Sequence, residues 1–338
     1  MMSHIDLNNH FISVFQYSDD VGKGLPMLTP IGVDLKDALR DFLKLEEKKR
    51  GYWHIETPPL GTRKLYALSE HATKYENNMY PSFVAYNRDY VLRSVNCPNH
   101  YMMFKSQLRP FYHLPIRYAE MSTLLRKDKS GELDGLFRTN AFTINDAHIF
   151  CTRENVKREF LGVIDFIKCF LDALCCVEKD DIKYRLSLSD GDLSNNKYLK
   201  QPELWEEAEE YLGEIMQNSG VDYYVEKNKA CYYGPKLDVF MKRINGKFEI
   251  IATAQLDFIL PEMFDVYFIN KNNQKERPVV IHRGLPFSME RTIGFLMERY
   301  QGDLPLWLAM ISDRMEAERK VNQQKLKYRN DIDNVYKR

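Results

Sequence analysis

The sequence predicts an α+β fold in which an antiparallel sheet is flanked by helices at its ends and on one face. Strand-like runs outnumber helical patterns, and the turn Asn245-Gly246 between two of them is typical of an antiparallel hairpin. The helical patterns do not alternate with strands, as they would in a parallel βαβ chain. A GxxxxGK[ST] or GxGxxG loop is also absent, so any nucleotide site must be of another kind.

Composition limits the classes of function. A chain of 338 residues with 44% hydrophobic residues can bury one large domain, or one large domain and one small domain. Lys plus Arg and Asp plus Glu both number 48, so the net charge is zero. A nucleic-acid partner therefore cannot be argued from overall charge and would need a local basic patch.

The cysteine pattern and the apolar runs bear on the cellular location. The six cysteines form no CxxC pair, which favours reduced thiols in a cytoplasmic protein. The first residues lack the basic and apolar regions of a signal peptide. No uncharged apolar run has the length of a membrane span. We therefore expect a cytoplasmic protein without a membrane anchor.

The first hundred residues predict a helix, two strands and a short second helix. Asp34 is the expected N-cap of a helix that ends near Gly51, and its buried face is predicted to hold Leu35, Leu39, Phe42 and Leu43. A β-rich run over residues 52–57 ends at Pro58. Residues 60–90 are polar, and we expect them to be mobile. A strand over 89–95 then leads to a helix over 100–107.

Residues 114–152 predict an antiparallel hairpin with a long tip. One strand covers 114–120 and leads to Arg126, a polar loop covers 127–135, and the second strand covers 136–143 and carries Arg138. Two arginines on a hairpin suit a phosphate ligand, because the guanidinium fork matches its oxygens. Solvated surface arginines are the alternative, and the residues of the hairpin by themselves favour it.

The remaining elements follow from periodicity and turn residues. Thr152 is expected to cap a helix, and Ser288 to Tyr300 is predicted to form another. The apolar stripe of the first comprises Val156, Phe160, Val163, Ile164, Ile167 and Leu171, and the second presents Met289, Ile293, Leu296 and Met297 inward. Between them we expect a helix over 203–218 and strands over 184–189, 231–242, 248–260 and 277–282.

Several of these segments together resemble the catalytic core of threonyl-tRNA synthetase, a class II aminoacyl-tRNA synthetase. The matching runs, in the family's order, are SVNCPNH (94–100), LPIRYAE (114–120), FTINDAHIFCT (142–152), YYGPKLD (232–238), TAQLDFILP (253–261) and VIHRGLPFSMERTIG (279–294). The resemblance implies a six- or seven-stranded antiparallel sheet flanked by helices. It also implies a catalytic domain over 31–310, preceded by an N-terminal extension over 1–30 and followed by a charged tail over 311–338.

The resemblance implies that ATP and Mg²⁺ are used to form an aminoacyl-adenylate. Arg126 would contact the α-phosphate, Arg291 the γ-phosphate and Arg138 the tail of a bent nucleotide, while Asp128 would lie near the adenine. Without the resemblance, an ion pair of Arg291 with Glu290 or Glu298 on a helix surface would be the simpler interpretation.

The resemblance also implies a Zn²⁺ ion that holds the amino group and the hydroxyl of threonine. Its ligands would be Cys97, His148 and His282, and three protein ligands leave coordination open for a substrate. Asp146, Tyr233 and Gln255 would line the same amino-acid pocket. The wide spacing of the three ligands does not indicate a zinc site by itself, since a buried Cys or His is common in a core.

Some residues depart from the family's pattern. Asn140 and Ile144 differ in the hairpin, Ile250 and Ile251 precede TAQLDF where polar residues are typical, and Phe287 stands where the family has glycine near ATP. We expect these changes to alter the pocket wall and to leave the arginines and metal ligands in place.

The partners implied by the family are threonine, tRNA and a second copy of the chain. The strand over 52–57 and its proline resemble motif 1, which builds the homodimer interface in class II synthetases. The matching region contains no editing or anticodon-binding domain, so the acceptor stays open. The alternatives are a free-standing paralogue that transfers an amino acid to a carrier protein or small molecule, and a non-catalytic regulatory paralogue.

Overall fold

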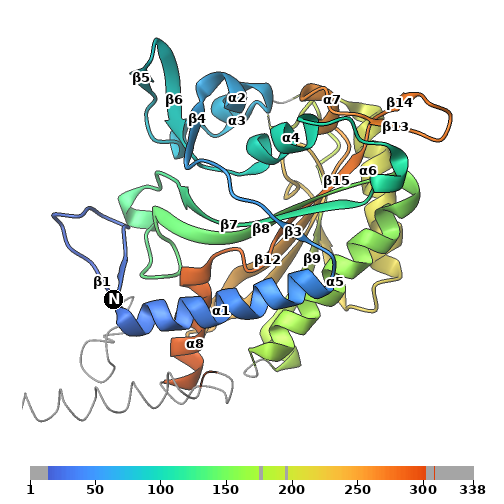
Figure 1. Ribbon diagram of the computed structural model, residues 1–338. Coiled ribbons are helices and arrows are strands. Elements are labelled where there is room, and N and C mark those ends of the chain that lie inside the picture. The colour runs from blue at the N-terminus through green and yellow to red at the C-terminus, as the bar shows by residue number, and fades with distance from the viewer. Residues whose placement is uncertain (1–13, 175–177, 195–196, 302–307, 309–338) are drawn as a thin grey trace, which may run out of the picture.

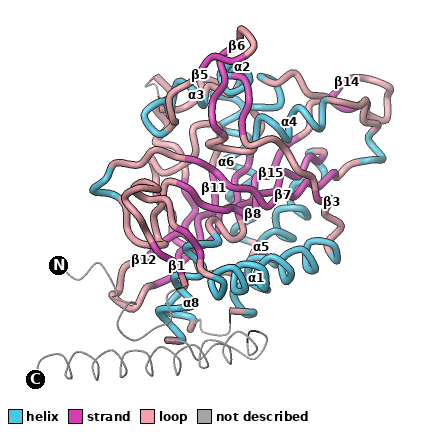
Figure 2. Tube along the Cα trace, turned by 60° about the vertical axis from the view of Figure 1, so that its left-hand side comes forward, coloured by secondary structure: helices cyan, strands magenta, loops and turns pink. Residues whose placement is uncertain are grey.

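A computed structural model describes residues 14–174, 178–194, 197–301 and 308 of the chain. Its elements form a central sheet with long helices below and shorter elements above, as Figures 1 and 2 show from two directions. The charged tail predicted over 311–338 lies outside the described residues.

The central sheet has eight strands. Their spatial order is β10 (Tyr223–Glu226), β9 (Ile182–Ser187), β11 (Lys236–Lys242), β12 (Phe248–Asp257), β15 (Val279–Gly284), β8 (Ala141–Cys151), β7 (Ile116–Leu125) and β3 (Trp53–His54). The six central strands pair antiparallel, and β10 and β3 add parallel edges next to β9 and β7. The predicted fold class is confirmed, and the short edge strands extend the six or seven strands expected.

Long helices cover one face of this sheet. They are α1 (Pro30–Lys49), α5 (Val156–Ala173), α6 (Pro202–Gln217) and α8 (Met289–Tyr300). The apolar stripes predicted for α5 and α8 are buried in the main core, together with Leu35, Leu39 and Leu43 of α1, while Phe42 is half-buried. Burial of these amphipathic faces stabilises the helices against the sheet.

The predicted N-cap of α1 is wrong. The helix begins at Pro30, and its N-cap is Thr29, whose hydroxyl accepts a hydrogen bond from the Gly32 backbone N–H at 3.3 Å. Proline suits the first turn because its missing N–H has no intrahelical partner to lose. Part of the predicted N-terminal extension also packs on the domain: Val14 is buried in the main core beside the hairpin of β1 (Phe15–Gln16) and β2 (Met27–Leu28).

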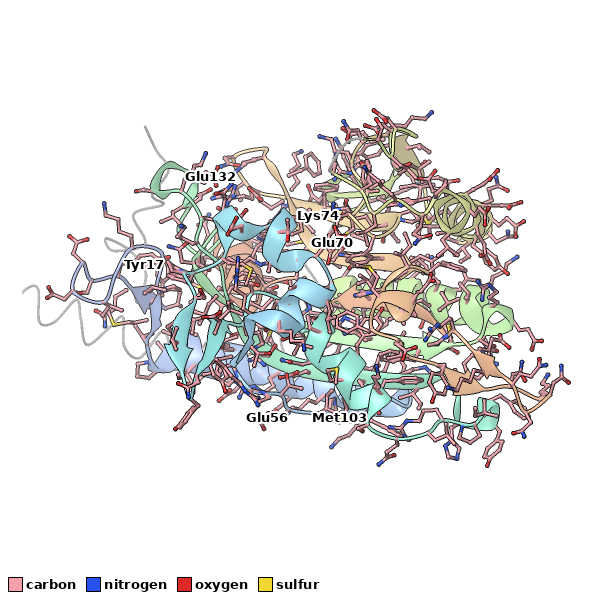
Figure 3. The ribbon with its side chains drawn as sticks, turned by 90° about the horizontal axis from the view of Figure 1, so that it is seen from above. Tyr17, Glu56, Glu70, Lys74, Met103 and Glu132 are labelled. Atoms are coloured by element: carbon pink, nitrogen blue, oxygen red, sulfur yellow. The ribbon has the colours of Figure 1, made fainter. Side chains whose placement is uncertain are left out.

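The opposite face carries smaller elements. They are α2 (Arg63–Leu68), α3 (His71–Lys74), α4 (Cys97–Lys105) and a three-stranded sheet of β4 (Leu60–Thr62), β6 (Arg88–Leu92) and β5 (Phe83–Ala85). Residues 60–90, predicted to be a mobile polar stretch, therefore contain regular structure. Their core is small, because it is built from Tyr66, Ala72, Met79 and Val91, which explains the weak sequence signal. In Figure 3 the segment with Glu70 and Lys74 lies over the sheet.

The ends of three predicted strands are corrected. The second hairpin strand begins at Ala141 instead of Leu136, so Arg138 lies in the loop. Leu136 and Phe137 look strand-like because they are apolar, but they pack into the core, where the Phe137 ring meets Phe295 of α8 edge-on at 5.1 Å. Similarly, β11 begins at Lys236, because Cys231 to Gly234 form a turn. The strand expected over 52–57 is confined to β3.

The remaining short elements connect these layers. They are α7 (Leu260–Met263), β13 (Phe268–Ile269), β14 (Lys275–Glu276), and single 3₁₀ turns over Glu76–Asn78, Phe111–His113, Ser130–Glu132, Arg153–Asn155 and Lys179–Asp181. The turn at Arg153 follows Thr152, so α5 itself starts at Val156, four residues after the expected cap.

Strand alternation places a row of polar side chains on the upper face. Ala147 and Ile149 of β8 point into the core below, so Asp146 and His148 point upward. His148 lies opposite His282 of β15, and His282 lies opposite Gln255 of β12. Three neighbouring strands therefore bring together residues more than a hundred positions apart.

Candidate active site

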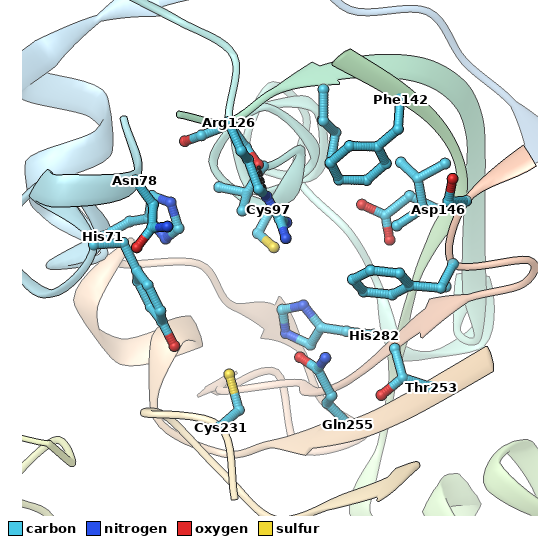
Figure 4. Close-up of a pocket in the computed structure, with 18 of the residues that line it drawn as sticks. His71, Asn78, Cys97, Arg126, Phe142, Asp146, Cys231, Thr253, Gln255 and His282 are labelled. Atoms are coloured by element: carbon cyan, nitrogen blue, oxygen red, sulfur yellow. Dashed lines mark hydrogen bonds between the residues drawn. The ribbon is translucent and has the colours of Figure 1, made fainter. Parts of the chain in front are cut away.

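A cavity of about 490 Å³ lies above these three strands. Nine of the ten predicted site residues line it, namely Cys97, Arg126, Asp128, Arg138, Asp146, Tyr233, Gln255, His282 and Arg291. The tenth, His148, is fully buried, and its ring centroid is 4.5 Å from that of His282. Figure 4 shows Arg126 and Phe142 facing Gln255 and His282 across the cavity, with Cys97 between them.

Cys97, His148 and His282 form a group that can hold a metal ion. One ligand atom from each lies within 4.8 Å of the other two. Around a tetrahedral zinc with bonds of about 2.0–2.3 Å, ligand atoms are roughly 3.5 Å apart, which is compatible with a group of this size. Nε2 of His148 and Nδ1 of His282 are buried and have no hydrogen-bond partner among the described residues, as expected of nitrogens that face a cation.

The other ring nitrogens of the two histidines are hydrogen-bonded. Nε2 of His282 lies 2.8 Å from Oδ2 of Asp257, and Nδ1 of His148 lies 2.9 Å from Nδ1 of His100. Metal-binding histidines typically use their second nitrogen in this way, which fixes the ring orientation. Burial raises the pKa of the Cys97 thiol, and a bound cation would counter this by favouring the thiolate. The residues present therefore fit a zinc ion.

The predicted amino-acid pocket lies beside this group. Asp146 accepts a hydrogen bond from the side-chain amide of Asn96 at 3.0 Å, and burial raises the pKa of its carboxyl. The Tyr233 hydroxyl donates to the carbonyl oxygen of Gln255, and its ring stacks on His282 at 4.7 Å. Burial raises the pKa of Tyr233 well above its usual value, so its hydroxyl stays protonated at neutral pH.

Arg126 and Arg291 supply positive charge to the other half of the cavity. Arg126 donates to the Ser94 carbonyl at 3.1 Å, and Arg291 donates to the carbonyls of Phe137 and Ile250 at 2.9 and 2.6 Å. Neither forms an ion pair with a carboxylate in the described part of the chain. Burial lowers the pKa of both side chains, that of Arg291 to about 10. Arginine has so high a pKa in water that both side chains are still cations at neutral pH.

The helix-surface interpretation of Arg291 is therefore wrong. Glu290 instead pairs with Lys36 at 3.0 Å, and Glu298 pairs with Arg243 at 2.9 Å. Two half-buried guanidinium groups that face a cavity and have no carboxylate partner among the described residues are well suited to a ligand that supplies the opposite charge.

Arg138 and Asp128 differ from these two arginines. They pair with each other at 2.8 Å, and Arg138 also contacts Glu132 at 2.7 Å at the tip of the hairpin. The Arg138 side chain is 45% exposed. As it stands, Arg138 forms surface ion pairs, and a nucleotide contact would require it to share or leave them.

An apolar cluster closes the cavity near the arginines. It consists of Leu124, Phe142 and Ile144, with Phe287 packed against it. Of the positions that depart from the family's pattern, Ile144 and Phe287 line the cavity. Asn140 instead accepts a hydrogen bond from the Asp128 backbone N–H at 2.9 Å and donates to the Lys23 carbonyl at 2.9 Å, so it ties the hairpin to the N-terminal segment. Ile251 is buried in the core below.

Sequence reasoning missed several residues that support the site. Asn96, His100, Glu120 and Asp257 all contact a predicted site residue or a neighbour of one. Each belongs to one of the matching motifs, but its role depends on contacts between distant segments. The signal that could have found them was a polar residue within an otherwise apolar strand or helix start.

The chain is similar to known tRNA synthetases. The family model "tRNA synthetase class II core domain (G, H, P, S and T)" matches residues 83–300. A threonine–tRNA ligase of Geobacillus sp. (strain WCH70) is 41% identical over 300 residues, which are 89% of this chain and 46% of the relative. Threonine–tRNA ligase 1 of Bacillus subtilis (strain 168) is 40% identical over the same shares. The chain thus spans about half the length of these relatives.

Solved structures give the same picture. A structure described as the RNA binding domain of threonyl-tRNA synthetase from Cryptosporidium parvum Iowa II has a TM-score of 0.81 and 31% identity, covering 87% of this chain and 72% of that one. Prolyl-tRNA synthetase of Giardia lamblia, in complex with prolyl-adenylate, has a TM-score of 0.61 at 15% identity, over 82% and 48% of the two chains, and shows the fold alone. Within the described residues, no helix is long and apolar enough to cross a membrane.

Proposed function

The chain belongs to the class II tRNA synthetase core family, and we propose that it activates threonine with ATP and transfers the threonyl group to tRNA. One observation carries the proposal. A single cavity is lined by Arg126 and Arg291, which have no carboxylate partner within the described residues, and by Cys97 and His282 of the Cys-His-His group. The arginines suit polyphosphate, and the Cys-His-His group suits a small ligand with an amino group and a hydroxyl.

The chemistry needs no general base. The threonine carboxylate is already ionised at neutral pH, so one of its oxygens can attack the α-phosphorus of ATP directly. The new carboxyl–phosphorus bond forms as the bond from the α-phosphorus to the bridging oxygen breaks, and pyrophosphate leaves with the electron pair. Catalysis then consists of aligning the reactants and stabilising the charge on the phosphates.

The surroundings of two arginines support this proposal. Arg126 holds its guanidinium between the Ser94 carbonyl and the ring of Phe142, whose centroid is 5.1 Å away. Arg291, at the start of α8, donates hydrogen bonds to the backbone carbonyls of Phe137 and Ile250. We assign Arg126 to the α-phosphate and Arg291 to the γ-phosphate, with Asp128 and Arg138 at the nucleotide's edge. Mg²⁺ would enter with ATP as its phosphate complex.

The Cys97, His148 and His282 group would hold Zn²⁺ and leave coordination open for substrate. When bound, the ion would act as a Lewis acid and template for the amino group and hydroxyl of threonine. Valine has no hydroxyl to offer, so it would be rejected. Asp146 would accept a hydrogen bond from the substrate, while Tyr233 and Gln255 would hold its position.

Amino-acid-dependent exchange of pyrophosphate with ATP tests the activation step. We expect threonine to support exchange and valine to fail, and the absence of exchange with any amino acid would refute an enzymatic function. Cys97→Ala should lose both bound zinc and exchange. Cys231→Ala is the matched control, because Cys231 lines the same cavity outside the metal group. Undiminished exchange in Cys97→Ala would refute the metal assignment.

Charging of purified threonine tRNA tests the acceptor. Formation of threonyl-tRNA would support the complete proposal. Exchange without charging would instead favour a carrier protein or small molecule as the acceptor of the threonyl group.

We also propose that the chain forms a homodimer through the segment around β3. This strand is the edge of the central sheet, and the Trp53 ring on it is 57% exposed. An exposed aromatic residue on an edge strand is typical of a surface that pairs with another chain. A cytoplasmic location stays a prediction from the sequence.

A further inference from the structure

A buried chain of three side chains leads away from the proposed metal group. Nδ1 of His148 lies 2.9 Å from Nδ1 of His100, and Nε2 of His100 lies 3.0 Å from Oε2 of Glu120. His148 and His100 are fully buried, and Glu120 is 2% exposed. No water is needed to connect them, because each distance is that of a direct hydrogen bond.

The carboxylate of Glu120 can act only as an acceptor here. Its Oε1 accepts from the Thr57 backbone N–H at 3.0 Å and from Arg93 at 2.9 Å, and its Oε2 accepts from the Thr57 hydroxyl at 2.8 Å. An ionised carboxylate has no proton to donate, and three donors in addition to His100 favour its ionised form. Nε2 of His100 therefore carries a proton and donates a hydrogen bond to the Glu120 carboxylate.

The position of the proton on His100 determines the position of the proton on His148. With one proton on each ring, a proton on Nε2 of His100 leaves its Nδ1 as an acceptor. Nδ1 of His148 must then donate, which leaves Nε2 of His148 unprotonated. In the part of the chain that the structure describes, Nε2 of His148 has no hydrogen-bond partner, and a metal ion needs its lone pair.

We propose that His100 and Glu120 are positioning residues that fix His148 in the tautomer able to bind the metal. The proposal rests on the proposed zinc site and adds two residues that the ligand set does not include. His282 needs no such relay, because the Asp257 carboxylate is itself 2.8 Å from its Nε2. The two ligand histidines are thus fixed by carboxylates, one directly and one through a second imidazole.

The surroundings of Glu120 make Glu120→Gln a sharp test. The amide oxygen of Gln would take the place of Oε1, because two donors, the Thr57 N–H and Arg93, point there. Its NH₂ would then face Nε2 of His100 and donate to it. His100 would respond by carrying its proton on Nδ1, and His148 would be driven to hold its proton on the nitrogen that faces the metal.

Two substitutions of His100 separate this role from simple filling of space. His100→Asn can place an amide oxygen near the position of Nδ1, so His148 keeps its acceptor. His100→Phe fills the space without an acceptor. Glu159→Gln is the matched control. Glu159 is a buried carboxylate that forms an ion pair of 2.7 Å with Arg117 of β7, and this pair lies away from the metal group.

The experiment measures Zn²⁺ affinity by competition with a chromophoric chelator, and the visible spectrum of the Co²⁺-substituted protein. Thermal unfolding of each variant verifies that it is folded. We expect Glu120→Gln and His100→Phe to bind Zn²⁺ about 10- to 100-fold more weakly, with a weakened tetrahedral Co²⁺ spectrum. His100→Asn and Glu159→Gln should stay within about threefold of the wild type, clearly below that range.

Each outcome bears on a different claim. Wild-type affinity in folded Glu120→Gln, or equal losses in His100→Asn and His100→Phe, would overturn the relay while the zinc site stands. A wild-type protein that binds no Zn²⁺ would overturn the metal site and the relay together.

Discussion

Phe287 occupies the part of the cavity where a nucleobase would need an apolar surface. Its ring stacks on Phe142 with centroids 6.0 Å apart and planes inclined by 20°. The guanidinium carbons of Arg126 and Arg291 lie 5.9 and 5.3 Å from its centroid. If Arg126 and Arg291 bind the phosphates as proposed, a base next to them would have to replace Phe287 against Phe142, so we predict that Phe287→Ala binds ATP more tightly.

The size of the effect follows from the contact that the base must break. A stacked aromatic pair contributes about 0.5–1.5 kcal/mol beyond the area it buries. If ATP binding separates the two rings, a variant that lacks the Phe287 ring has no stacking contact to break. Its KM for ATP should therefore be lower by about 2- to 10-fold. The KM for threonine should not change, because the metal group and Asp146 lie outside this apolar cluster.

The assay is threonine-dependent pyrophosphate exchange at saturating threonine with ATP varied. Phe142→Ala is the informative partner, since loss of the ring on which the base stacks should raise the KM for ATP. Phe83→Ala, in the β5–β6 hairpin, is a control for the loss of an aromatic ring elsewhere. A higher KM for ATP in Phe287→Ala would refute the reasoning, because it would mean that the base stacks on Phe287 itself.

Three further predictions address charge, pH and assembly. Arg126→Gln should lower kcat/KM for exchange by about 10²- to 10³-fold, with the exposed Arg158→Gln as control, and a loss below threefold would contradict a phosphate contact. Burial lowers the pKa of His71 from 6.5 to about 3, so the unfolded chain binds an extra proton between these values. Stability should therefore be complete above pH 6.5 and fall towards pH 3 by up to about 1.4 kcal/mol per pH unit. In urea unfolding at pH 7 and 5, the wild type should lose more stability than His71→Gln, and equal losses would disprove this origin. Trp53→Glu should give monomers in light scattering, whereas Ile244→Glu, at the β11–β12 turn, should not; a dimer in both would exclude β3 as the interface.

The sequence was sufficient for the fold class and for the similarity to threonyl-tRNA synthetases, and both are confirmed. Periodicity also located the buried faces of α5 and α8. Strand ends were less accessible, because local pattern cannot distinguish an apolar residue in a strand from one that docks on a helix. Phe137 is the clearest case, since its contact with Phe295 is 158 residues away along the chain.

Part of the candidate site could be predicted from local sequence motifs, and part of it could not. Motifs pointed to ten residues that we expect to contact ligands, and the structure gathers nine of the ten around one cavity. The supporting residues were not accessible, because their roles depend on hydrogen bonds such as that between Thr57 and Glu120, which joins positions 63 apart. The roles of the ten residues themselves stay predictions, to be tested by the variants described above.

Two residues that depart from the family's motifs are neighbours in the structure. Ile144 and Phe287 are far apart in sequence, yet both converge on Gly284: a Cβ atom there would lie 3.3 Å from Ile144 Cδ1 and 3.7 Å from Phe287 Cδ2. Gly284 pairs with Asp146 across the sheet and follows His282 by two positions. The apolar cluster therefore lies beside Gly284, whose strand partner Asp146 belongs to the proposed threonine pocket. Since the two side chains share this space, a change in one alters the surroundings of the other, and their effects on substrate binding should not be additive.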